Sequence, residues 1–159
     1  MRRPAASCRI SSTQGAERVR VRDAGLRIGD GRSEFRREGN NVTRDEAWTL
    51  ANHWVESWNA HDLGEIMSHY EEDVQLTSPV AARLLEIADG RVTGKANLRA
   101  YFERGLAAFP DLSFQLEEVL WGLNSVVLYY TNQRGTRTAE FMELGPGGKV
   151  ARVIAHYNA

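Results

Sequence analysis

The spacing of apolar residues changes once along this chain, close to Pro110, and this change limits the possible folds. Between Thr43 and Phe109, apolar residues recur mostly at the three- and four-residue intervals of amphipathic helices. Between Leu112 and Tyr157 they alternate with polar residues, as in half-buried strands. Helices followed by consecutive strands are typical of an α+β domain, and 159 residues suffice for one such domain.

Three helices are expected. Thr43 is a suitable N-cap for the first, and Glu46 three residues later completes a capping box. Asp62 caps a second short helix, and a third begins at Gly94 and ends before Pro110. The residues expected on the inner faces of these helices are Ala47, Ala51, Trp54, Val55, Trp58, Leu63, Ile66, Met67, Tyr70, Leu98, Tyr101, Phe102, Gly105 and Phe109.

A short strand is expected between the second and third helices, at Val74–Thr77, where Pro79 stops it. Residues 79–90 fit a loop, with a helical turn at 81–87 as one possibility. Four further strands are predicted at Leu112–Trp121, Val126–Gln133, Thr136–Leu144 and Val150–Tyr157. Short turns separate these four strands, which predicts hairpins and hence an antiparallel meander.

Successive strand residues point to opposite faces, so the turns decide which side chains face inward. A turn centred on Pro146-Gly147 places Glu140 opposite Val153. The inner face then holds Thr138, Glu140, Met142, Val153, Ala155 and Tyr157. The same count across Arg134-Gly135 adds Val127, Tyr129 and Thr131. A slip of one residue at a bulge would instead turn their neighbours inward: Tyr130 for Tyr129 and His156 for Tyr157.

Residues 1–42 differ from the rest of the chain in composition. They hold ten arginines and five acidic residues, whereas residues 43–159 hold ten Lys and Arg and 16 acidic residues. Gly and Ser are frequent, and Phe35 is the only aromatic residue of the segment. Such a segment has too little apolar surface to offset the entropy of ordering. We therefore expect a disordered basic extension at 1–42 and one folded domain at 43–159.

The basic extension lacks interleaved aromatic residues and dense charge clusters, so it does not predict nucleic-acid binding. A transit peptide and upstream sequence from an early start codon are two alternatives, of which we favour the second. Cys8 is the only cysteine and has no intramolecular partner, which suits a reducing compartment and a cytoplasmic protein. With a mean hydropathy of −0.45 and no long apolar run, no membrane span is expected.

Five short motifs stand out in the body of the chain: Tyr70–Val74 (YEEDV), Val92–Lys95 (VTGK), Tyr101-Phe102, Phe109–Leu112 (FPDL) and Arg152–Tyr157 (RVIAHY). Together they resemble the SnoaL-like branch of the nuclear transport factor 2-like superfamily, over residues 44–159. The resemblance implies a cone of three N-terminal helices on a strongly curved antiparallel sheet, enclosing a pocket. It also implies a homodimer through the outer face of the sheet. It leaves activity open, because the superfamily includes isomerases, polyketide cyclases, dehydratases, epoxide hydrolases and non-catalytic binding proteins.

The resemblance to ketosteroid isomerases can be followed at three positions. Where those enzymes have an Asp general base before a proline, this chain has Ser78, and a hydroxyl without a partner is a poor base. Trp54 stands where they have an oxyanion-binding Tyr, and Glu140 where they have a protonated Asp. We therefore do not expect ketosteroid isomerase activity. Limonene-type epoxide hydrolysis is not expected either, because residues 130–133 lack the Asp and Arg that it requires.

Glu140 is the predicted catalytic acid or base, with Trp54 and Tyr129 as polar helpers. The other residues predicted to line a ligand pocket are Trp58, Tyr70, Ser78, Phe102, Trp121, Met142, Val153 and Tyr157. Each has a simpler interpretation: Glu140 as a surface or dimer-face carboxylate, and the aromatic residues as core. No cofactor is expected, and no metal, because no His has a second His or Cys at ligand spacing.

Two functions of different class fit these residues. The first is an enzyme that isomerises, cyclises or dehydrates a small apolar carbonyl compound by acid–base chemistry at Glu140. The second is a non-catalytic binding module with the same fold. Ser78 at the position of the missing base favours the second, and a carboxyl group in an apolar cavity favours the first.

Overall fold

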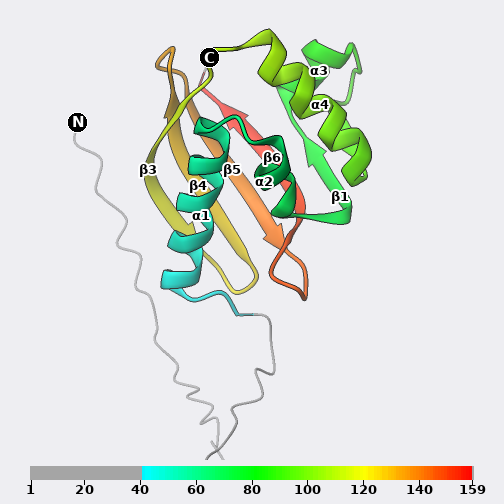
Figure 1. The fold of residues 1–159 in the computed structure, drawn as a ribbon. Coiled ribbons are helices and arrows are strands. Elements are labelled where there is room, and N and C mark those ends of the chain that lie inside the picture. Colours follow the sequence, from blue (N-terminus) through cyan, green and yellow to red (C-terminus); the bar gives the residue numbers. More distant parts are fainter. Residues whose placement is uncertain (1–40, 159) are drawn as a thin grey trace, which may run out of the picture. The chain divides into compact units, whose positions relative to one another are not determined.

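The computed structural model describes residues 41–158. Helices cover one side of a single curved sheet (Figure 1). The elements follow in the order α1 (Arg44–Asn59), α2 (Leu63–Ser68), β1 (Tyr70–Thr77), α3 (Pro79–Leu85), β2 (Arg91–Thr93), α4 (Lys95–Ala108), β3 (Phe114–Trp121), β4 (Ser125–Asn132), β5 (Arg137–Leu144) and β6 (Val150–Tyr157). This is the α+β class that the sequence predicts, and none of the described helices has the length and apolarity to span a membrane.

The caps of α1 and α2 form as predicted. The Glu46 amide donates to the Thr43 hydroxyl at 3.3 Å, and the Thr43 amide donates to the Glu46 carboxylate at 2.9 Å. Asp62 Oδ1 accepts from the amides of Gly64 and Glu65, which starts α2. Each cap satisfies amides that have no partner within the first helical turn.

The structure has a fourth helix, α3, in the segment for which the sequence pattern left open a loop with a helical turn at 81–87. Ser78 caps it, its Oγ accepting from the amides of Val80 at 3.1 Å and Ala81 at 3.4 Å. Gly90 ends the segment that contains α3 and has a φ of 61°, and its carbonyl accepts from the Ser78 amide. A side chain at Gly90 would meet the Ser78 carbonyl oxygen at 2.4 Å, so only glycine fits this close approach. The expectation of three helices is therefore wrong by this one.

The sheet has the strand order β2-β1-β6-β5-β4-β3. Its pairs are antiparallel except one, because β1 lies parallel to the last strand, with Leu76 opposite Val153. The predicted antiparallel meander is confirmed for β3 to β6, and the parallel pair of β1 with β6 is an addition that the sequence did not predict. The pairing joins the first and last strands of the domain, and no local sequence pattern predicts it. It places Ser78, at the end of β1, beside the end of β6.

The register differs from the prediction at both C-terminal hairpins. Glu140 pairs with Ala155 rather than Val153, an error of two residues that leaves the face assignments unchanged. Between β4 and β5 the loop is one residue longer than predicted, with the Asn132 amide donating to the Thr136 carbonyl. Gly135 occupies the left-handed region there, at a φ of 77°, as is common in three-residue hairpin loops. This odd change reverses β4, so Val126, Leu128 and Tyr130 face inward.

At the start of the described region, Val42 belongs to the body. Its amide donates to the Leu123 carbonyl at 2.7 Å, and its side chain packs partly against the core. The predicted basic extension, apart from residues 41 and 42, lies outside the described residues, as does Cys8.

Candidate functional site

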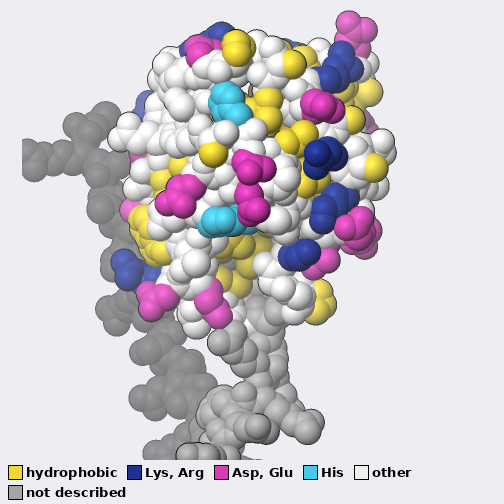
Figure 2. All heavy atoms as spheres, in the orientation of Figure 1, with side chains coloured by type: hydrophobic (Ala, Val, Ile, Leu, Met, Phe, Trp, Pro, Cys, Tyr) yellow, Lys and Arg dark blue, Asp and Glu magenta, His cyan; other side chains and the backbone are white. Residues whose placement is uncertain are grey.

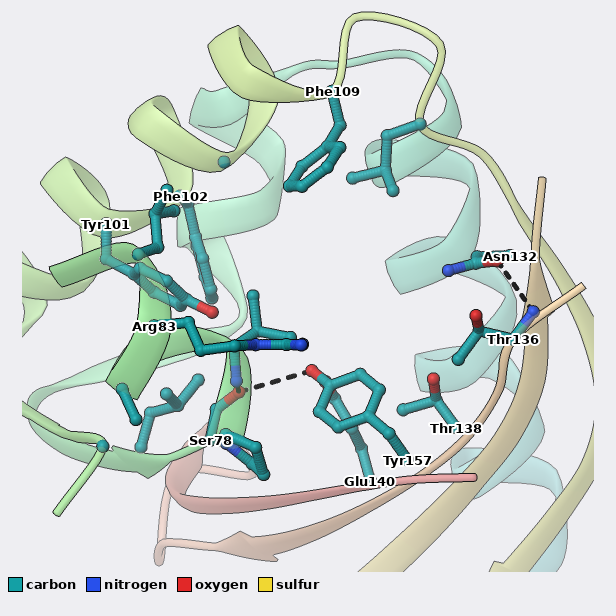
Figure 3. A pocket seen from close by; sticks show the side chains of 18 of the residues that line it. Ser78, Arg83, Tyr101, Phe102, Phe109, Asn132, Thr136, Thr138, Glu140 and Tyr157 are labelled. Carbon is teal, nitrogen blue, oxygen red and sulfur yellow. Dashed lines mark hydrogen bonds between the residues drawn. The ribbon is translucent and has the colours of Figure 1, made fainter. Parts of the chain in front are cut away.

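A cavity of about 980 Å³ lies between the inner face of the sheet and the helices α1, α3 and α4 (Figure 3). Its size suits a small organic ligand. One group of lining side chains is aromatic: Trp54, Trp58, Tyr101, Phe102, Phe109, Phe114, Tyr130 and Tyr157. A second group is polar or charged, and includes Ser78, Arg83, Asp89, Asn132, Arg134, Thr136, Thr138 and Glu140.

The aromatic side chains brace one another. Trp54 stacks on Phe114 with ring centres 5.6 Å apart and planes at 9°, and Trp58 meets Phe102 edge-on at 4.8 Å. Such pairs favour defined ring positions, so this wall is formed before any ligand binds. The Trp58 indole Nε1 is the one buried side-chain nitrogen or oxygen within residues 41–158 that lacks a hydrogen-bond partner. A ligand acceptor would satisfy it.

Glu140 is the buried acid of the cavity. Only 8% of the residue is exposed, and Tyr130 donates a hydrogen bond to its Oε1 at 3.1 Å. No Lys or Arg of the described chain forms an ion pair with it. Burial raises the pKa of Glu140 from 4.5 to about 7, although the Tyr130 hydrogen bond favours the charged form and lowers it. Near neutral pH, this carboxyl group can therefore both donate and accept a proton.

Four tyrosine hydroxyls lie in the electrostatic field of Glu140. Burial is the largest cause that raises the pKa of Tyr70, Tyr101, Tyr130 and Tyr157, and the Glu140 charge raises each further. The pKa of Tyr101 reaches about 12, and those of the other three rise well above their usual range. All four phenols therefore stay protonated at physiological pH and can act as hydrogen-bond donors.

A family profile for the SnoaL-like domain matches residues 51–158, almost the whole described body. The chain belongs to the SnoaL-like family. A SnoaL-like protein of unknown function from Burkholderia thailandensis is 33% identical, covers 75% of this chain and 99% of its own, and superposes with a TM-score of 0.72. The family that the sequence motifs resemble is thus confirmed.

More distant structures share the fold. A proposed ketosteroid isomerase from Kribbella flavida is 19% identical, with a TM-score of 0.58 over 72% of this chain and 79% of its own. An NTF2-like protein of unknown function from Cytophaga hutchinsonii is 12% identical, with a TM-score of 0.54 over 74% of this chain and 91% of its own. These confirm the predicted NTF2-like fold and carry no further conclusion. A comparison with curated proteins found no match.

The SnoaL-like body brings six of the predicted site residues to the cavity: Trp54, Trp58, Ser78, Phe102, Glu140 and Tyr157. Their functional roles stay predictions. Trp54 does not offer a free donor, because its Nε1 already donates to the Tyr70 hydroxyl at 2.9 Å. Ser78 uses its Oγ to cap α3.

Five predicted site residues do not line the cavity. Tyr129 points to the outer face, because the longer β4–β5 loop turns Tyr130 inward in its place. Tyr70 is buried in the core against Trp54. Met142 and Val153 pair with each other nearer the β5–β6 turn, in the packed end of the cone, and are fully buried. Trp121 ends β3 and is 47% exposed.

Arg83 and Tyr101 are among the polar residues of this SnoaL-like cavity that the sequence prediction did not assign to the site, and it gave Tyr130 only as the alternative to Tyr129. Tyr101 was assigned to the inner face of a helix, but only as core. A three-residue loop, recognised from Asn132 and Gly135, would have favoured Tyr130 over Tyr129. Arg83 had no signal, because it lies in the segment for which the sequence pattern left two alternatives.

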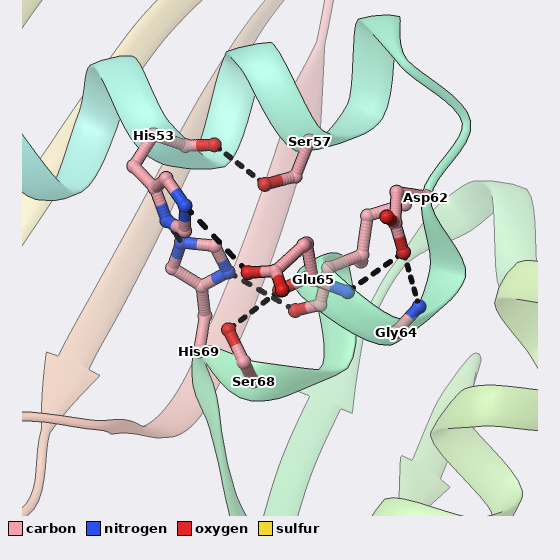
Figure 4. Close-up of polar contacts among 8 residues, drawn as sticks. His53, Ser57, Asp62, Gly64, Glu65, Ser68 and His69 are labelled. Carbon is pink, nitrogen blue, oxygen red and sulfur yellow. Dashed lines mark hydrogen bonds and ion pairs between the residues drawn. The ribbon is translucent and has the colours of Figure 1, made fainter.

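A second polar cluster of the SnoaL-like body lies away from the cavity, between α1 and α2 (Figure 4). His53 Nδ1 lies 2.9 Å from His69 Nε2, and His53 Nε2 lies 3.7 Å from a Glu65 carboxylate oxygen. His69 Nδ1 lies 3.2 Å from the Ile66 carbonyl oxygen. On the face covered by α1 and α2, histidines indeed lie beside acidic side chains (Figure 2). No group of three or more metal-binding side chains exists in residues 41–158.

Proposed function

We propose that this SnoaL-like domain binds a small apolar molecule with a carbonyl group and transfers a proton on it, with Glu140 as acid and base. The observation that carries the proposal is a buried carboxyl group at an aromatic-walled cavity, with Tyr130 as its one hydrogen-bond partner within residues 41–158. The pKa of about 7 supports it, because both protonation states are then populated at neutral pH. The unpartnered Trp58 indole supports a ligand that carries an acceptor.

The chemistry needs one group that takes a proton and returns it. Ionised Glu140 removes a proton from the carbon next to the carbonyl, and the electron pair of the C–H bond moves to the carbonyl oxygen as an enolate. The unpartnered indole Nε1 of Trp58, which lines the cavity, is a donor that can stabilise this oxygen. Where a carbon–carbon double bond lies next to the deprotonated carbon, the enolate is conjugated with it. The carboxylic acid of Glu140 then returns the proton to the far carbon of that double bond, and the double bond moves next to the carbonyl group. The result is an isomerised ligand with no atom gained or lost.

The alternative is a binding module without turnover. Ser78 favours it, because its hydroxyl caps α3 and has no carboxylate beside it. The other acid that lines the cavity, Asp89, accepts a hydrogen bond from the Arg91 amide, so the proposed proton transfer is assigned to Glu140.

Deuterium exchange separates the two functions. A panel of small cyclic unsaturated ketones is first tested for binding by native mass spectrometry and then incubated with the protein in D2O. We expect exchange of the proton next to the carbonyl, and a loss of about a hundredfold in Glu140→Gln, the range of general acid–base catalysis. Glu143→Gln is the matched control, since Glu143 lies on the same strand but the opposite face. Binding without exchange in the native protein indicates a binding module. If the native protein neither binds these ketones nor exchanges the proton, the proposal is rejected.

We also propose that the protein forms a homodimer through the outer face of the sheet. The register aligns four apolar residues in one row across four strands: Leu120, Val127, Phe141 and Ile154. Leu120 is 58% exposed and the other three are half-buried in the single chain. A second copy would cover this row. Light scattering should show a dimer that Phe141→Arg dissociates and Leu123→Arg, at the tip of the β3–β4 loop, does not.

A further inference from the structure

One corner of the cavity, where α3, α4 and β6 meet, is built from hydrogen-bond donors. Arg83 reaches from α3 into the open cavity toward the Tyr157 hydroxyl, and the Tyr101 hydroxyl points to the same space (Figure 3). Ser78 lies beneath them, with its Oγ 3.3 Å from the Tyr157 hydroxyl. We call Ser78, Arg83, Tyr101 and Tyr157 the donor corner.

The direction of each hydrogen bond follows from the groups around Ser78. Its Oγ already accepts from the amides of Val80 and Ala81, so its one hydrogen is directed to a phenol oxygen, that of Tyr157 or that of Tyr101. Tyr157 then keeps its phenolic hydrogen for another acceptor. Tyr101 also keeps its proton, because burial raises its pKa to about 12. The Arg83 guanidinium is always charged, and its proximity lowers the pKa of both tyrosines against the effect of burial.

Residues 41–158 supply no counter-ion for this corner. No ion pair with Arg83 is present in the described residues. Two acids line the cavity, and neither neutralises the guanidinium. Glu140 is bound by Tyr130, and Arg83 has no resolved influence on it. Asp89 Oδ1 accepts from the Arg91 amide at 3.1 Å. The positive charge of Arg83 and two phenol hydroxyls thus face the cavity, and among the described residues both phenols have Ser78 as a hydrogen-bond partner.

We infer that the natural ligand carries a carboxylate, which binds at Arg83, Tyr101 and Tyr157 while its apolar body lies against the aromatic wall. A guanidinium presents two parallel N–H donors that match the two oxygens of a carboxylate. The inference rests on the proposed small-molecule binding in this cavity, but not on proton transfer. It limits the substrate class to apolar carboxylic acids, such as keto acids.

A matched pair of probes tests the charge preference. Naphthaleneacetate and naphthaleneacetamide have the same shape and the same apolar body, and differ in the carboxylate. Calorimetric titration at pH 6, where Glu140 is mostly protonated, should show that the native protein binds the acid about tenfold more tightly than the amide. In Arg83→Met, that preference should disappear while the affinity for the amide stays the same. Tyr157→Phe should reduce the preference by a smaller factor.

Two further arginine variants make the test specific. Arg99 lies exposed on α4 outside the cavity, so Arg99→Met should keep the full preference. Arg134 also lines the cavity, with its guanidinium 5.1 Å from the centre of the Phe109 ring. If Arg134→Met removes the preference and Arg83→Met does not, the carboxylate site is at the other wall and the inference is wrong. Equal binding of acid and amide by the native protein also overturns it. If neither probe binds, the proposed small-molecule function itself is in doubt, which is a separate outcome.

Discussion

Glu140 in the cavity and His69 between α1 and α2 show the same physical effect with opposite signs. Burial is the largest cause in both: it raises the pKa of Glu140 and lowers the pKa of His69. In each case burial removes water from the charged form and so disfavours it. The charged form of a carboxyl group is the deprotonated one, whereas the charged form of an imidazole is the protonated one. Burial therefore favours the uncharged form of both groups: Glu140 with a proton bound, and His69 with a proton released.

The two regions differ in what opposes this effect. Only the Tyr130 hydroxyl favours the charged form of Glu140. His69 has the Ile66 carbonyl as an acceptor, which raises its pKa, while neighbouring His53 lowers it. The facing nitrogens of His53 and His69 are 2.9 Å apart, so one proton can lie between them. His53 is exposed and His69 is half-buried, so water screens their charge in part, whereas Glu140 is enclosed. The cavity group should thus have the larger effect on stability.

The largest predicted effect is that of Glu140→Gln on the pH dependence of unfolding. The folded pKa lies above the unfolded one, so ionisation opposes folding as pH rises from 4.5 to about 7. Above this window the cost is roughly 3 kcal/mol, less whatever relaxation the cavity allows. Urea unfolding at pH 8 should find Glu140→Gln more stable than the native protein, by up to that amount, and at pH 4 nearly equal. If the free energy of unfolding depends on pH in the same way in Glu140→Gln and the native protein, as is expected for Glu143→Gln, then Glu140 is not desolvated.

A smaller effect is expected from Tyr130→Phe. The variant removes the one hydrogen bond that favours ionised Glu140, so the pKa of Glu140 should rise further above about 7. Hydrogen bonds to charged groups contribute about 1.5–3 kcal/mol. NMR titration of the carbon-labelled Glu140 carboxyl group measures this directly. Tyr129→Phe is the matched control, an adjacent tyrosine on the outer face, and should leave the titration unchanged.

The smallest effect concerns the histidine pair. The folded pKa of His69 lies below 6.5, so the unfolded chain binds more protons as pH falls, and folding loses stability below about pH 6.5. His69→Asn should remove part of this acid sensitivity, by less than about 1 kcal/mol because the site is partly exposed. Thermal unfolding between pH 5 and 7 would detect it, with His156→Asn, an exposed histidine of β6, as the control. If stability falls with pH between 7 and 5 as steeply in His69→Asn as in the native protein, burial of His69 does not contribute to the acid sensitivity.

Prediction from sequence succeeded where the determinants are local. Thr43 and Asp62 cap helices through side chains that reach two or three residues along the chain. Glu140 was placed on the inner face although its partner was wrong by two residues, because an even error preserves the alternation of a strand. Tyr129 was placed inside because the β4–β5 loop was taken one residue too short, and an odd error exchanges the two faces.

The sequence by itself therefore determined the α+β class, the SnoaL-like family and the inward position of Glu140. Only the tertiary structure decided that Arg83 and Ser78 lie beside Tyr157. Their proximity depends on the parallel pairing of β1 with β6, residues more than seventy positions apart, and on the folding of α3 over that edge. Alternation and capping repeat over a few residues and can be read locally. A contact between the first and last strands is set by how the whole sheet closes, which no short window of sequence contains.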